Sequence, residues 1–151
     1  GEEVLVGDPD GNQVLVYSID AKYFDGSTQD GPGPDRTLTP SDARRFGTSL
    51  AWGKITGQGQ PLLAVGAIGT EVDGAESAGA IYVLDSSYKE VARATLASPE
   101  ADQLLGEQLA IMPFRVSGQS SPLEVLAAAG DDAVYVFFSN LTSDHDDTRN
   151  R

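Results

Sequence analysis

Short apolar runs recur along the chain, and residues that favour turns separate them. The runs are rich in Val, Leu, Ile, Ala and Tyr, and they fall at residues 4–6, 14–17, 63–67, 80–84, 123–129 and 133–138. Runs of this length, bounded by Gly, Pro, Asp and Ser, are typical of β-strands. Only residues 40–44 and 99–104 have a composition suited to a single turn of helix. The pattern therefore predicts an all-β chain of many short strands.

Two of the turns have the composition of β-hairpin connections. Residues 8–12 read Asp-Pro-Asp-Gly-Asn, and residues 130–132 read Gly-Asp-Asp. Pro presets one backbone angle, whereas Gly and Asn accept the positive φ that closes a tight turn. Each turn is therefore predicted to join two neighbouring antiparallel strands.

The apolar runs also form an internal repeat with a period of about 60 residues. Three runs align with one another, each is followed by a second strand, and two further segments that precede them align as well. The aligned sets are 4–8, 63–67 and 124–128; then 13–17, 80–84 and 133–137; and finally 46–52 with 105–111. Residues 90–96 alternate apolar and polar side chains, which predicts an outer strand with one solvated face. Such a period suits one blade of a β-propeller.

The composition narrows the classes of partner. Acidic residues number 23 and basic residues 10, a net charge of −13, so a nucleic acid or an anionic membrane surface would be repelled. There is no Cys, which excludes disulfides and thiolate zinc sites. No stretch has the roughly 18 apolar residues of a membrane span. The chain begins directly in a strand pattern rather than in a signal peptide, which favours a processed product or one section of a longer protein.

Residues 46–84 resemble a whole FG-GAP repeat, the unit of integrin-α-type β-propellers. The resemblance depends on Phe46-Gly47, on the strand at residues 63–67 with its Val-Gly-Ala, and on the strand at residues 79–84. It is weaker over residues 105–138 and partial over 2–17, and it extends to the propeller region of secreted phospholipases D that act on glycosylphosphatidylinositol anchors.

The resemblance implies a partial β-propeller of about two and a half four-stranded blades. Residues 1–44 are expected to form a partial blade and a loop, and residues 45–104 a complete blade. Residues 105–139 are expected to form a degenerate blade, and residues 140–151 a polar tail.

FG-GAP repeats often carry a calcium loop between their first two strands, and this chain departs from that pattern. Calcium needs several oxygen ligands, usually carboxylates. The corresponding loop, residues 53–62, places Lys54, Thr56, Gln58 and Leu62 where carboxylates are expected. The loop at residues 113–119 is no richer in carboxylates. We therefore predict no metal and no cofactor in this chain.

Few residues suggest catalysis. The single histidine, His145, lies among aspartates in the polar tail, where a frayed terminus is the simpler interpretation. The carboxylate pairs Asp8/Asp10 and Asp131/Asp132 fall in tight turns, where Asp caps its own backbone, although an acid pair of the glycosidase type remains an alternative. We therefore predict no catalytic residues in this chain.

The aromatic residues divide into two groups. Those on predicted strands are expected to pack in the core, and those in predicted loops are expected to face a partner. The first group is Trp52, Tyr17, Tyr82 and Tyr135, and the second is Tyr23, Phe24 and Phe114.

These observations lead to two hypotheses of function. The first is a non-catalytic scaffold or recognition module for protein or glycan in an extracellular or cell-surface protein, consistent with a glycosylation sequon at Asn140. The second is a structural part of a secreted hydrolase that acts on glycosylphosphatidylinositol anchors, with catalysis in a separate zinc-dependent domain. Because so few blades cannot close a ring, a further polypeptide, more of the same precursor, or copies of the chain must complete it, and the first two are favoured.

Overall fold

The computed structural model describes residues 2–19, 33–55, 60–115, 117–118 and 123–137, and within them it contains ten strands and no helix. The strands are β1 (Glu2–Asp8), β2 (Gln13–Ile19), β3 (Arg36–Leu38), β4 (Phe46–Gly53), β5 (Leu62–Ala67), β6 (Ala80–Leu84), β7 (Glu90–Ala94), β8 (Gln108–Phe114), β9 (Leu123–Ala129) and β10 (Val134–Phe137). The predicted all-β class is confirmed. None of the described residues belongs to a helix that could cross a membrane.

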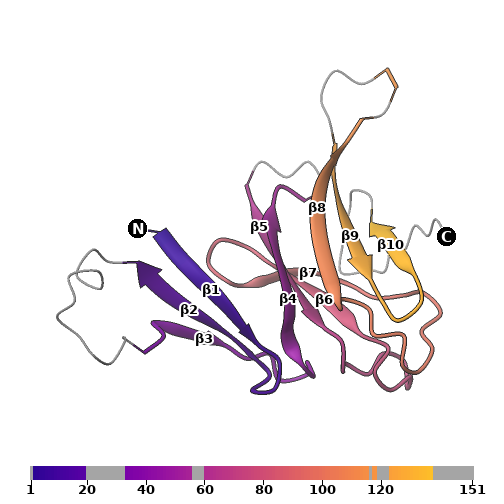
Figure 1. The fold of residues 1–151 in the computed structure, drawn as a ribbon, viewed down its shortest axis with the longest axis horizontal. Helices are drawn as coiled ribbons and strands as arrows, with labels where there is room; N and C mark the ends of the chain where they lie inside the picture. The colour runs from indigo at the N-terminus through magenta and orange to yellow at the C-terminus, as the bar shows by residue number, and fades with distance from the viewer. Residues whose placement is uncertain (1, 20–32, 56–59, 116, 119–122, 138–151) are drawn as a thin grey trace.

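The strands form three antiparallel sheets, in which strands that follow one another in the chain are neighbours. Sheet I has the order β1-β2-β3, sheet II the order β4-β5-β6-β7, and sheet III the order β8-β9-β10. The sheets follow one another across the molecule, with sheet I at one end, sheet II in the middle and sheet III at the other end (Figure 1). Contacts between β1 and β4 and between β4 and β8 join them. In the described residues no sheet closes on itself.

Both predicted hairpins are present, and side chains reinforce the first of them. β1 ends at Asp8 and β2 begins at Gln13, while β9 ends at Ala129 and β10 begins at Val134. The Asp8 carboxylate accepts hydrogen bonds from the Gly11 backbone N–H at 3.0 Å and from the Gln13 side chain at 2.7 Å. These two bonds hold the pKa of Asp8 below its usual value. The aspartate therefore serves the turn, as its position predicted.

The cross-strand registers correct one part of the predicted repeat. Leu50 pairs with Val65 in sheet II, and the equivalent Leu109 pairs with Ala128 in sheet III. The strand β9 is therefore shifted by two residues relative to the sequence alignment, so that Gly66 corresponds to Ala129. A shift of two residues keeps every side chain on the same face, which is why the alternation along the strand could not detect it.

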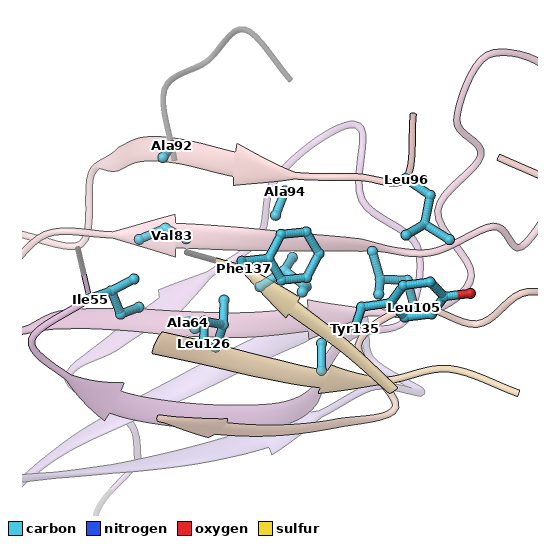
Figure 2. Packing of buried hydrophobic residues seen from close by; sticks show 12 residues of the cluster. Ile55, Ala64, Val83, Ala92, Ala94, Leu96, Leu105, Leu126, Tyr135 and Phe137 are labelled. Atoms are coloured by element: carbon cyan, nitrogen blue, oxygen red, sulfur yellow. The ribbon is translucent and has the colours of Figure 1, made fainter. Parts of the chain in front are cut away.

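The buried side chains form two clusters, one between each pair of neighbouring sheets. The cluster between sheets I and II contains Val14, Phe46, Leu63, Val65, Tyr82 and Leu84. The cluster between sheets II and III contains Ile55, Ile81, Val83, Leu105, Leu126, Tyr135 and Phe137 (Figure 2). In the first cluster the rings of Phe46 and Tyr82 meet edge to face, with centroids 5.4 Å apart. Burial between sheets therefore stabilises the fold.

Three predictions about individual residues and segments have different outcomes. Tyr82 and Tyr135 are buried, as predicted. Trp52 is 49% exposed, so its predicted burial is wrong, because no described element packs over this end of β4. The short strand β3 was not predicted, since its sequence Arg-Thr-Leu has too few residues to show a period.

Candidate interaction surface

The same glycine contact joins each pair of neighbouring sheets. A Cβ atom on Gly7 would lie 2.0 Å from the carbonyl oxygen of Gly47, and one on Gly66 would lie 2.1 Å from that of Gly106. Gly47 and Gly106 both have a positive φ, +94° and +97°. Only glycine allows the approach at the first two positions, and glycine adopts the required backbone angle most readily at the other two. Sheets I and II therefore meet in the same way as sheets II and III.

Each sheet also uses its two faces in the same way. We call the face turned toward the preceding sheet its front face and the face turned toward the following sheet its rear face. The front faces of sheets II and III are buried, through Leu63, Val65, Tyr82 and Leu84 in sheet II and through Leu126, Ala128, Tyr135 and Phe137 in sheet III. The rear faces of sheets I and II are buried too, through Val14 and Val16 in sheet I and through Ile81 and Val83 in sheet II.

The front face of sheet I has no described neighbour, although it is apolar. The register places Val4 beside Tyr17 and Val6 beside Leu15 on this face, which Ile19 extends. Val4 and Val6 are each 44% exposed and Ile19 is 37% exposed. The corresponding residues of sheet II, which include Leu63 and Val65, are fully buried. A continuous exposed apolar face of this kind is typical of an interaction surface.

The rear face of sheet III is the second apolar face without a described neighbour. Val134 is 60% exposed and Met112 is 43% exposed on it, whereas Val125 and Ala127 on the same face are buried. The residue of sheet II that corresponds to Val134 is Ile81, which is fully buried against sheet III. The two ends of the described structure therefore present the same two kinds of face that are buried in its interior.

A cluster of charged side chains bridges sheet II and the segment that leads into it. The Arg93 guanidinium lies 4.1 Å from the ring centroid of Tyr82 and forms ion pairs with Asp42 and Glu90. The hydrogen bond from Arg93 lowers the pKa of Asp42, and burial raises the pKa of Tyr82 to about 12. Burial opposes the charge of Arg93, but bonds to the two carboxylates hold its pKa above the usual value. Because Arg93 is paired with both carboxylates, the cluster holds sheet II against the segment that leads into it.

A second polar contact joins sheet I to the turn between β6 and β7. The Tyr88 hydroxyl donates a hydrogen bond to Glu3, and the Arg36 guanidinium lies 5.8 Å from the Tyr88 ring centroid. Burial and the neighbouring carboxylate raise the pKa of Tyr88 to about 12. This contact lies at the rim of the apolar cluster between sheets I and II, where it fixes the position of one sheet against the other.

An open groove of about 440 Å³ lies beside this contact, between β3 and sheet II. Its lining is Thr37, Leu38, Thr39, Pro40, Phe46, Leu84, Tyr88 and Glu90. Glu90 is already paired with Arg93, so the groove presents no unpaired carboxylate. The one carboxylate in the lining is therefore held by the Arg93 cluster.

Several of the predicted site residues lie outside the described residues. These are Asn140, His145, Tyr23, Phe24 and part of the loop at residues 53–62. Asp10 forms an exposed ion pair with Arg45, and Asp131 and Asp132 lie exposed in the turn between β9 and β10. Across the described residues, no three His, Cys, Asp or Glu side chains lie close enough together to hold a metal ion.

The sequence contained part of the signal for the exposed apolar faces. Val4 and Val6 alternate with residues of the opposite face, as a sheet with two distinct faces requires. What the sequence could not show is which faces are covered. Comparison with models of known protein families, with curated proteins and with solved structures finds no match for this chain.

Proposed function

We propose that the chain is a non-catalytic section of a β-propeller of the FG-GAP type, in which sheets I, II and III are successive blades. In this interpretation sheet II is a complete blade, while sheets I and III each lack one strand. The proposal is supported chiefly by the repeated glycine contact, Gly7 with Gly47 and Gly66 with Gly106. One step that relates consecutive sheets is the property that builds a propeller.

The exposed apolar faces support the second part of the proposal, that further blades cover both ends. The front face of sheet I and the rear face of sheet III are equivalent to faces that are buried between sheets. Exposed in isolation, they would promote association with other molecules. We propose that another polypeptide supplies the remaining blades, in an extracellular or cell-surface protein that carries a glycan on Asn140. The complete ring then serves as a scaffold or as a recognition module for protein or glycan.

The native mass of the chain isolated from its source without denaturant tests the proposal. We expect a mass well above the 15.8 kDa of one chain, and denaturant should release a second polypeptide. A stable, folded monomer of one-chain mass would overturn the proposal and indicate a self-contained β protein.

A matched pair of variants identifies the surface that is involved. Val6 and Val91 are both strand valines with similar exposure in the isolated chain, 44% and 46%. Val6 lies on the front face of sheet I, whereas Val91 lies on the outer strand of sheet II. We expect Val6→Lys to lower the native mass and Val91→Lys to leave it unchanged, because burying an unpaired charge is costly. Equal behaviour of the two variants would contradict a covered front face.

A further inference from the structure

The strand β1 lies at the edge of sheet I. β1 pairs with β2 along its whole length, and no described strand pairs with its other edge. The equivalent strand in sheet II, β5, has β6 on one edge and β4 on the other. Gly7 in β1 corresponds to Gly66 in β5, so the free edge of β1 is the place that β4 occupies in sheet II. An unpaired edge of this length is a ready template for another strand.

Trp52 provides an independent observation at the same place. It lies on the front face of β4, and its equivalent in sheet III is Ile111, since Trp52 pairs with Leu63 and Ile111 with Leu126. Ile111 lies against the preceding sheet, where a Cβ on Gly53 would be 3.0 Å from it. Trp52 is 49% exposed because sheet I has no strand that corresponds to β4.

We propose that a β-strand from outside these 151 residues pairs antiparallel with the free edge of β1 and covers Trp52. This inference rests on the proposed function and deepens it by placing one contact of the partner. Main-chain hydrogen bonds to β1 supply the affinity, and side chains at alternate positions supply the specificity.

The register of β4 on β5 predicts the residues of the incoming strand. When the register of β4 on β5 is transferred to β1, large apolar residues of the incoming strand lie opposite Val6 and Val4. Small residues lie opposite Leu5 and Glu3. The small residue opposite Glu3 faces Trp52, as Gly53 faces Ile111. The next position lies opposite Glu2, which favours a basic residue there.

No other segment of the 151 residues has the pattern of this strand. The pattern of large apolar, small, large apolar, small and basic residues occurs at residues 50–54, which already belong to β4 and the position after it, and it does not occur in residues 20–32 or 138–151. A second copy would have to release β4 from its own sheet. Pairing of two β1 edges about Leu5 would place Glu2 opposite Asp8 twice, and like charges in this position are destabilising. We therefore assign the strand to a segment outside residues 1–151.

Trp52 is the only tryptophan in the chain, so the tryptophan emission comes from this position alone. The probe is a synthetic peptide with the sequence of residues 46–54 carrying Trp52→Phe, so that the peptide itself does not contribute. On titration into the full chain, we expect the Trp52 emission to move to shorter wavelength and to saturate. A matched peptide that also carries Gly53→Leu should bind about tenfold more weakly or worse, because its larger side chain meets Trp52.

A charge exchange tests the register. Glu2→Lys in the chain should weaken the peptide about two- to fivefold, and a peptide with Lys54→Glu should recover the loss. Equal binding of the Gly53→Leu peptide, or no change in emission with any peptide, would overturn the strand site. A shift to shorter wavelength on concentrating the chain alone would instead assign the edge to a second copy. A large native complex together with an unresponsive Trp52 would refute this inference and leave the proposed propeller intact.

Discussion

Gly66→Ala should be one of the most destabilising single-methyl changes in this protein. The added Cβ would lie 2.1 Å from the carbonyl oxygen of Gly106 and 2.4 Å from the Ser49 hydroxyl oxygen, whereas such contacts are not found below 3.0 Å. Sheets II and III must therefore separate by about 1 Å, or the strand must bend by as much. The Ser49 hydroxyl also donates a 2.6 Å hydrogen bond to Gly106, which this movement breaks.

The two effects set the expected size of the loss. Overpacking of this kind costs about 1–3 kcal/mol, and the hydrogen bond contributes about 1 kcal/mol. The free energy of unfolding should therefore fall by about 2–4 kcal/mol. Urea unfolding followed by Trp52 fluorescence measures it, because Trp52 lies in the same sheet. The unfolding midpoint should move down by about 1–2 M urea.

Gly33→Ala is the matched control, since a Cβ at Gly33 meets nothing within 4 Å. It reports the effect of the extra methyl on the unfolded chain alone. Ser49→Ala should cost about 1 kcal/mol by itself, and it should reduce the cost of Gly66→Ala because it removes one of the clashing atoms. If Gly66→Ala and Gly33→Ala unfold within about 0.5 kcal/mol of each other, the close contact between the sheets is refuted.

Three further predictions concern the polar contacts. The Asn12 side chain donates a hydrogen bond to the Ala43 carbonyl oxygen and accepts one from the Phe46 N–H, and Asn12 itself has a φ of +54°. Asn12→Gly should therefore lower the free energy of unfolding in urea by about 1–2 kcal/mol, and Asn12→Ala by about 1 kcal/mol more. Equal losses would refute the role of the positive φ. Because the Asp42 pKa is lowered, its contribution is present above the unfolded value of 3.8 and disappears as the pH falls through the lower folded value. Asp42→Asn should therefore cost under about 1 kcal/mol at pH 7 and nothing in strong acid, and a cost that persists in acid would contradict the ion pair with Arg93. In an ultraviolet pH titration, Tyr82→Phe should remove a phenol that ionises near pH 12, and loss of one that ionises near pH 10 would contradict its burial.

The strands and hairpins could be predicted because their signals are local. Alternation of side chains along a strand and the chemistry of turn residues both act over a few neighbouring positions. Residues 80–84 became β6, and the Asp-Pro-Asp-Gly-Asn turn joined β1 to β2, as expected. The glycines of the repeat also appear in the sequence, although their partners do not.

The register of the third repeat could not be predicted from the same signals. Apart from Glu124, residues 123–129 are apolar and the last three are alanines, so the strand can slide by two positions without moving an apolar side chain to the wrong face. Only the pairing of Ala128 with Leu109 across the sheet decides between the alternatives. The short strand β3 was missed because pairing with β2, rather than its own three residues, makes it a strand.

Trp52 shows most clearly what could not be predicted from the sequence. An aromatic residue on a strand favours burial, yet burial depends on whether a neighbouring sheet reaches that position, and at Trp52 none of the described elements does. The sequence by itself determined where the chain forms strands and turns and which positions must be small. The tertiary structure alone decided that Gly7 lies against Gly47 and Gly66 against Gly106, and hence which faces and edges remain open. The physical reason is that side-chain pattern acts within one strand, whereas burial is set by surfaces that come from distant parts of the chain.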